Sequence, residues 1–134
     1  MRAEHASSGV ISKMGTGSMV LGNAANLMVG TLDITAGILA AGSDGALGDA
    51  GNMVRLSANN ATQGFRAIGT FTTARTFYLN QTLSGIDVTG GNTLTLSSAL
   101  GFGVATYALQ KNDNGVLELA ANNSTWNGTL TVAG

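Results

Sequence analysis

The chain has 134 residues, of which 10% are charged and 44% are hydrophobic, and its formal net charge is −1. This length is enough for one domain with a continuous core. The charge provides no basic surface for nucleic acid or an anionic membrane, and no apolar run reaches the roughly 18 residues of a membrane-spanning helix. The basic residues are scattered in a pattern typical of a solvated surface: Arg2, Lys13, Arg55, Arg66, Arg75 and Lys111.

Cysteine and proline are absent, whereas glycine occurs 20 times. Without cysteine there are no disulfides and no thiolate metal sites. Proline cannot donate to a strand ladder, so its absence fits a chain whose backbone is almost entirely paired. Glycine beside asparagine, aspartate, serine or threonine is typical of turns. This composition predicts many short strands joined by tight turns.

Taken in chain order, residues 1–9 show no strand pattern and are predicted to form a tail or cap, and residues 10–134 form the repetitive segment. Beyond the tail, apolar residues alternate with polar ones, which predicts strands with one buried face. The clearest of these segments are residues 31–35, 76–79, 86–89, 93–96, 117–119 and 129–132. We expect about a dozen strands, a number that suits a sandwich, a barrel or a solenoid equally well.

An internal repeat favours the solenoid. When residue 13 is aligned with residue 111, an offset of 98, six positions are identical without a gap. Lys13, Gly17, Leu21, Gly30, Thr31 and Leu32 match Lys111, Gly115, Leu119, Gly128, Thr129 and Leu130. The second copy stops inside its repeat unit, so we expect the chain to be part of a longer array. We also expect parallel strands stacked between coils, equivalent segments on equivalent rungs, and turn asparagines stacked amide on amide.

The stretch from residue 11 to 39 resembles the autotransporter-associated β-strand repeat, also called the passenger-associated transport repeat. The residues that carry the resemblance are Lys13, Gly15, Gly17, Met19, Leu21, Gly30, Thr31, Ile34, Gly37 and Leu39, followed by Ala46-Leu47-Gly48. A second copy near 109–134 departs at Asp113, where the repeat has glycine, and at Trp126, where tyrosine is more common. Residues 73–96 are similar to the spacer coils between repeats.

The resemblance implies an all-β fold, namely a right-handed single-stranded parallel β-helix. With ~20–25 residues per turn, the chain would form five or six coils. The resemblance also implies the exported passenger of a bacterial autotransporter, outside the cell or at its surface in association with the outer membrane. Absence of cysteine agrees with export of an unfolded chain.

The residues that could carry chemistry favour structural roles. His5 is the single histidine and lies in the predicted tail. Asp33, Asp87 and Glu118 are predicted to point outward as solvated charges with ordinary pKa values, although stacked coils could align two of them as glycosidase acids. Therefore no catalytic, cofactor-binding or metal-binding residue is assigned.

The remaining motifs also have simple structural interpretations. Residues 42–45 with Asp49 could supply oxygens to calcium, but a turn is favoured. The glycines of residues 15–17 lack the dinucleotide-binding pattern. Tyr78, Tyr107 and Trp126 could form a sugar-stacking platform or could pack in the structure. Regular threonine pairs (Thr31/Thr35, Thr93/Thr95, Thr129/Thr131) could dock on a regular surface such as a glycan or ice.

We therefore predict a non-enzymatic structural segment of a cell-surface adhesin, acting as stalk, scaffold or fibre and supporting export and adhesion. The alternative is a carbohydrate-active or glycan-binding β-helix domain. Expected partners are a second copy, stacked through the open solenoid ends, and a surface glycan or host ligand. The residues predicted to point inward are Leu32, Ile34, Leu79, Val88, Leu94, Leu96, Leu119, Leu130 and Val132.

Overall fold

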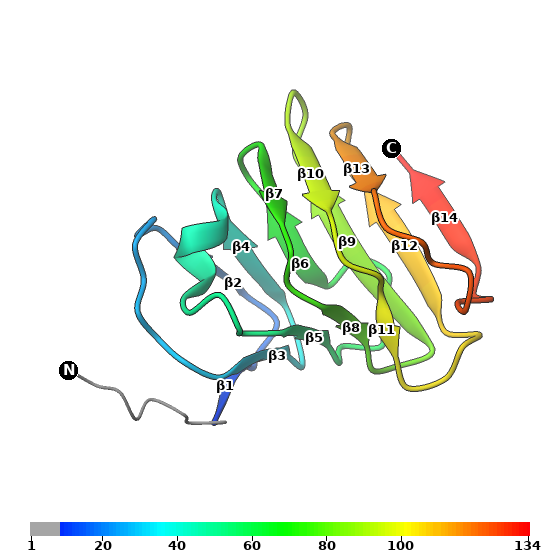
Figure 1. Cartoon of the computed structure of the whole chain (residues 1–134), viewed down its shortest axis with the longest axis horizontal. Helices are drawn as coiled ribbons and strands as arrows, with labels where there is room; N and C mark the ends of the chain where they lie inside the picture. The colour runs from blue at the N-terminus through cyan, green and yellow to red at the C-terminus, as the bar shows by residue number, and fades with distance from the viewer. Residues whose placement is uncertain (1–8) are drawn as a thin grey trace.

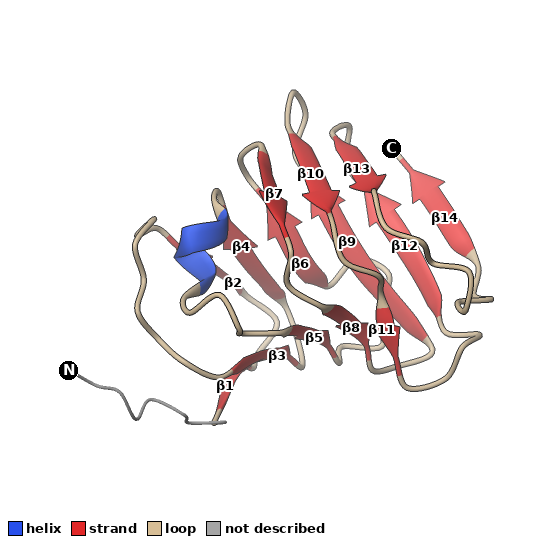
Figure 2. Cartoon of the chain, in the orientation of Figure 1, coloured by secondary structure: helices blue, strands red, loops and turns tan. Residues whose placement is uncertain are grey.

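Short strands wind into a parallel β-solenoid of about five turns (Figure 1). The computed structural model describes residues 9–134. The cartoon coloured by secondary structure shows strands along the whole length and one short 3₁₀ helix, η1 (Asp44–Leu47) (Figure 2). Strand pairs in the described residues are parallel, as predicted, and this excludes the sandwich and the antiparallel barrel.

The strands form three sheets, each of which takes at most one strand from each coil. Sheet A contains β1 (Val10–Lys13), β3 (Thr31–Ile34), β5 (Val54–Leu56), β8 (Phe77–Leu79) and β11 (Gly101–Phe102). Sheet B contains β2 (Ser18–Leu21), β4 (Ile38–Ala41), β6 (Gly64–Ala67), β9 (Leu83–Val88), β12 (Ala108–Asn112) and β14 (Leu130–Ala133). Sheet C contains β7 (Phe71–Thr73), β10 (Thr93–Leu96) and β13 (Val116–Leu119). In the second coil, η1 and its loop follow β4 where later coils have a sheet C strand.

The core consists of apolar columns that run through the stacked coils. Alternation places every second strand residue inside, because successive side chains point to opposite faces of a sheet. Leu32, Val54 and Phe77 stack in one such column of sheet A. Phe77 also meets Phe65 of sheet B edge to face, with ring centroids 5.2 Å apart. The core therefore joins the sheets as well as the coils.

The inward prediction is confirmed for six of the nine residues, which are buried: Leu32, Ile34, Leu79, Val88, Leu94 and Leu96. Leu119 is half-buried, and the predicted burial is wrong for Leu130 and Val132, which are 44% and 67% exposed. These two residues pair with the buried Leu109 and Lys111, so they continue inward columns. They are exposed because no strand stacks on β14 within the described residues.

The two repeat copies do not occupy equivalent rungs, so that prediction is wrong. The first copy places β1, β2 and β3 on sheets A, B and A, whereas the second places β12, β13 and β14 on sheets B, C and B. Three coils span 66 residues, from Ile11 through Leu32 and Val54 to Phe77. The 98-residue offset between the two copies is longer than four such coils by roughly one strand and its turn. The second copy is therefore shifted by one face around the solenoid axis.

Turn asparagines link successive coils, but through backbone and hydroxyl partners. Asn52 accepts from the Gly30 amide at 2.8 Å, and Asn123 accepts from the Leu100 amide at 2.8 Å. Asn59 accepts from the Thr82 hydroxyl at 2.8 Å. The predicted amide-on-amide ladder is wrong, because these side chains satisfy backbone and hydroxyl donors instead of one another.

Candidate functional surfaces

The three acidic residues proposed as glycosidase acids lie on three different sheets. Asp33 is in β3 of sheet A, Asp87 is in β9 of sheet B, and Glu118 is in β13 of sheet C. Glycosidase acids must flank one scissile bond about 5–9.5 Å apart. Residues on different outer faces of a solenoid cannot do so, and the arrangement therefore offers no support for a carbohydrate-cleaving pair.

Asp33 is held by a salt bridge and a hydroxyl. Arg55 Nη2 donates to Asp33 Oδ2 at 3.0 Å, and Ser57 Oγ donates to Asp33 Oδ1 at 2.6 Å. Burial raises the pKa of Asp33, but the two hydrogen bonds and the charge of Arg55 together bring that pKa below its usual value. Conversely, the hydrogen bond to Asp33 raises the pKa of Arg55. The predicted ordinary pKa is thus wrong for Asp33.

Asp87 is buried, contrary to the prediction of a solvated charge. Arg66 donates to Asp87 Oδ2 through Nε at 3.1 Å and through Nη2 at 2.9 Å. Asn112 Nδ2 donates to Asp87 Oδ1 at 2.9 Å and to the Ala61 carbonyl at 2.7 Å. The Asp87 carboxylate thus points outward from the strand but is covered by its partners Arg66 and Asn112. Glu118 accepts from the hydroxyl of the half-buried Thr95 at 2.8 Å.

The segment suspected of binding calcium surrounds a cation that the chain itself supplies. Arg75 is 5% exposed, and its guanidinium donates to oxygens of the loop that contains η1. The Asp44 carboxylate accepts at 2.7 Å, and the carbonyls of Asp44 and Gly48 each accept at 2.9 Å. The carbonyls of Asp49 and Asn52 complete the set. Over residues 9–134 no three potential metal-binding side chains cluster. The expectation that Arg75 is solvated is wrong.

The two repeat lysines are buried in matching corners, so their expected solvation is wrong as well. Lys13 Nζ donates to the carbonyls of Met14 at 2.9 Å, Gly15 at 2.7 Å and, one coil on, Ala36 at 3.2 Å. Lys111 Nζ donates to the Asp113 carbonyl, which is the equivalent of Gly15. Gly15 and Asp113 thus occupy equivalent corners, in each of which the backbone carbonyl accepts a hydrogen bond from the repeat lysine.

The backbone of this corner explains how Asp113 can replace glycine. Gly15 has φ 78° and Asp113 has φ 66°, both in the left-handed region. Aspartate adopts that region more readily than most residues, because its short side chain can bond locally. The second copy therefore keeps the corner geometry despite the change in sequence.

The three aromatic residues do not form one platform. Tyr107 and Trp126 pack against the core, and Trp126 Nε1 donates to the Tyr107 carbonyl at 2.8 Å. Tyr78 points outward from β8, because its neighbours Phe77 and Leu79 are the buried residues of that strand. The paired threonines likewise divide among the faces, since Thr31, Thr93 and Thr131 belong to sheets A, C and B. His5 lies outside the described residues.

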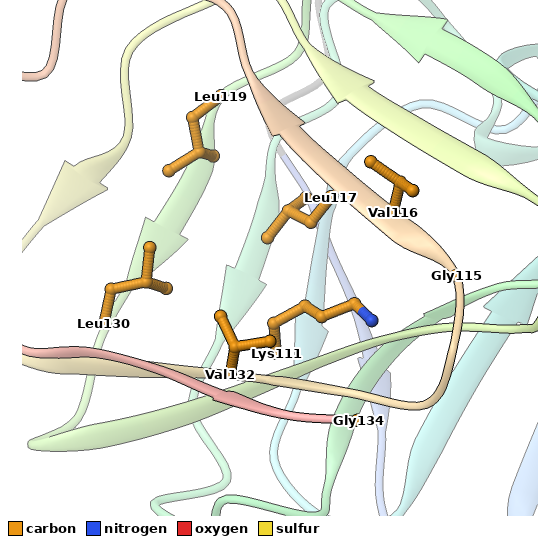
Figure 3. A pocket seen from close by; sticks show the side chains of 8 residues that line it. All are labelled: Lys111, Gly115, Val116, Leu117, Leu119, Leu130, Val132 and Gly134. Carbon is orange, nitrogen blue, oxygen red and sulfur yellow. The ribbon is translucent and has the colours of Figure 1, made fainter.

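The last coil leaves an open apolar cavity of about 250 Å³ (Figure 3). Its lining consists of Lys111, Gly115, Val116, Leu117, Leu119, Leu130, Val132 and Gly134. A smaller cavity of about 90 Å³ lies at the other end, between residues of β1, β2, β3 and β4 and Met28. The core columns therefore reach the surface at both ends of the described solenoid.

Sequence reasoning missed the buried cations, although a signal for them was present. Lys13 follows Ile11 by two positions, and Lys111 follows the buried Leu109 by two. Because side chains two apart share a face, this spacing placed both lysines inside. Arg75 likewise follows the buried Thr73 by two positions.

These features define a class, the parallel β-solenoid whose corners and loops are held by buried cations. Over 139 aligned residues the chain is 36% identical to the adhesin BmaC autotransporter of Brucella suis biovar 1 (strain 1330). The alignment covers 94% of this chain but 4% of that adhesin's length. No protein-family model and no solved structure matches the chain. Across residues 9–134, no helix is long and apolar enough to cross a membrane.

Proposed function

We propose that the chain is a structural segment of an exported cell-surface passenger, a rod that serves as stalk or scaffold for an adhesin. The observation that carries this proposal is the continuous parallel stacking of about five turns, with apolar columns open at both ends of residues 9–134. Such a unit can be lengthened coil by coil, because each coil contacts mainly its neighbours. The similarity to a short part of an autotransporter adhesin supports the same function.

A non-enzymatic role agrees with the chemistry of the faces. The acidic residues Asp33, Asp44 and Asp87 are each bound by an arginine, in salt bridges of 3.0, 2.7 and 2.9 Å. General acid–base catalysis needs two groups held on one substrate. In the described residues these charges instead hold strands and loops together, as expected of a scaffold.

The proposal is tested by making the rod longer and by following its export. Tandem copies of the chain, joined in one polypeptide, should increase the maximum dimension in small-angle X-ray scattering by about 24 Å per copy, from five turns at ~4.8 Å each. Placed in an autotransporter passenger, the chain should be cleaved by protease added to intact cells. A constant maximum dimension, or protection from the protease, would contradict the stalk proposal.

End-to-end self-association is a second part of the proposal. Strands β13 and β14 are edge strands, so one side of each has no strand paired with it in the described residues. Leu130 and Val132 of β14 are exposed apolar residues. This end therefore offers the kinds of groups that are paired and buried inside the solenoid. A parallel sheet can continue only if the C-terminal end of one copy meets the N-terminal end of the next, a head-to-tail contact. A contact the size of one coil is smaller than a standard interface, so the dissociation constant should be about 0.1 mM or weaker.

Light scattering over a concentration series tests this contact. We expect the mean mass to rise with concentration in the wild-type chain and to stay monomeric in Val132→Asp. Thr72→Asp, at an exposed position of β7 on the outer face of sheet C, is the control that should behave like wild type. A mean mass that does not change with concentration, or that rises equally in Val132→Asp, would contradict end-to-end stacking.

A further inference from the structure

The outer face of sheet A is a flat surface that combines one aromatic ring with polar side chains. Register places Asp33, Arg55, Tyr78 and Gly101 in one outward column on four successive coils. Ser57 follows Arg55 by two positions, and Asn80 follows Tyr78 by two positions. These two side chains are linked, because Asn80 Nδ2 donates to Ser57 Oγ at 3.0 Å. We call these residues other than Gly101 the sheet A face: Asp33, Arg55, Ser57, Tyr78 and Asn80.

The Tyr78 ring lies against the glycine of the next coil. A Cβ atom at Gly101 would come within 2.6 Å of Tyr78 Cδ2 and 3.4 Å of Tyr78 Cε2, so only glycine leaves room for the ring. Tyr78 itself is half-buried. A ring supported in this way presents an apolar body and a hydroxyl tip without losing much conformational freedom on binding.

The polar groups beside the ring are held in place before any ligand arrives. Asp33 is fixed by Arg55 and Ser57, and Ser57 is fixed by Asn80. Two groups at the margin of this network, Tyr78 Oη and Asn80 Oδ1, have no hydrogen-bond partner among residues 9–134. A donor–acceptor hydroxyl and a free acceptor next to a ring match the alternating hydroxyls and C–H faces of a sugar.

The charge of the sheet A face selects among ligands. Its single cation, Arg55, is paired with Asp33 through Nη2, so the face carries no net positive charge that would attract phosphate, sulfate or uronate. A neutral ligand that offers hydroxyls meets the free groups without stripping water from a charge. The chemistry therefore favours a neutral glycan chain over an anionic polysaccharide or a nucleic acid.

The other two outer faces lack this combination in the described part of the chain. On sheet B, the Arg66, Asp87 and Asn112 network is closed and bonds to the Ala61 carbonyl of a neighbouring loop. On sheet C, Thr93 and Thr95 stand in strand β10 without an aromatic neighbour on that face. Sheet A is thus the face on which a sugar ring could both stack and hydrogen-bond.

We propose that the sheet A face binds a neutral glycan chain, with Tyr78 stacking on a pyranose ring and Asn80 accepting from its hydroxyls. This goes beyond the proposed rod, which requires no ligand. One aromatic ring gives a weak site, with a dissociation constant of about 1 mM. Useful adhesion would then come from many such coils acting together along an array.

The test uses the full chain and three neutral hexasaccharides: cellohexaose, maltohexaose and β-1,4-mannohexaose, with hexagalacturonate as the anionic comparison. Chemical-shift titrations should show at least one neutral hexasaccharide binding at about 1 mM, and hexagalacturonate binding more weakly. Tyr78→Ala should weaken binding about tenfold or more, and Asn80→Ala about threefold. Thr95→Ala, on sheet C, is the matched control and should leave binding unchanged.

The circular dichroism spectrum and melting temperature identify a variant that fails to fold. Should Tyr78→Ala be misfolded, Tyr78→Leu and Asn80→Ala decide the question, because they keep bulk at the site or leave the ring intact. The proposal is overturned if no neutral hexasaccharide binds the wild-type chain at about 10 mM. It is equally overturned if hexagalacturonate binds more tightly, or if the folded sheet A variants bind as well as wild type. The rod proposal would survive any of these results.

Discussion

Replacement of Arg75 tests whether a buried cation holds the loop of the second coil. In Arg75→Met the side chain keeps an unbranched apolar stem but loses the guanidinium and its hydrogen bonds to Asp44, Gly48, Asp49 and Asn52. The carbonyls that lose their donor lie in a loop next to the core, where Ala46 and Leu47 are buried. A buried acceptor left without a partner costs about 1–3 kcal/mol.

The magnitude follows from how many acceptors lose their donor. Asp44 has a side chain that is 39% exposed, so water replaces much of what the guanidinium provides to it. The hydrogen bonds from Arg75 to the carbonyls of Gly48 and Asn52, at 2.9 and 3.4 Å, are buried. We expect Arg75→Met to lower the free energy of unfolding by about 3–4 kcal/mol, in the range found when one partner of a buried ion pair is removed.

Urea unfolding followed by circular dichroism measures this loss as a change in midpoint at constant slope. Arg55→Met is the matched control, because Arg55 also pairs with one aspartate but its side chain is 30% exposed. It should cost about 1 kcal/mol or less. Arg75→Lys should fall between the two, since lysine keeps the charge but loses the planar fork. A loss in Arg75→Met no larger than in Arg55→Met would refute the reasoning.

Three further predictions concern the corner, the acid-sensitive pair and a close backbone approach. Asp113→Gly should be neutral or slightly stabilising and Asp113→Val should cost about 1–2 kcal/mol in urea unfolding, because φ is 66° there; equal stability of the two would contradict the corner geometry. Because the folded-state pKa of Asp33 is lowered, its contribution is complete above the unfolded pKa of about 4 and is lost as pH falls through the folded value. Unfolding between about pH 6 and pH 2 should therefore show a steeper loss of stability in wild type than in Asp33→Asn, and identical curves would refute this assignment. Gly85→Ala should cost about 2 kcal/mol or more by melting, since its Cβ would lie 2.3 Å from the Ala61 carbonyl oxygen, whereas Gly17→Ala, with nothing within 4 Å, should cost under about 1 kcal/mol; similar losses would contradict the close approach.

The sequence alone determined the kind of element and the apolar residues that point inward in the clearest strands. Alternation at Leu32 and Ile34, or at Leu94 and Leu96, is a local property, because successive side chains on a strand face opposite ways whatever the strand packs against. The absence of proline and the abundance of glycine pointed to many paired strands and turns for equally local reasons. The repeat then chose the solenoid over the sandwich.

The tertiary structure decided which residues meet across coils. Stacked coils in sheet B differ in length, with 20 residues from Ser18 to Ile38 but 26 from Ile38 to Gly64. Such differences arise in the loops. The alternation of residues within a strand therefore does not predict which strand of the next coil that strand will pair with. This is why Arg75 reaches Asp44, 31 positions away, and why the strand acids are separated onto three faces. It is also why the second repeat copy begins one face further round than the first.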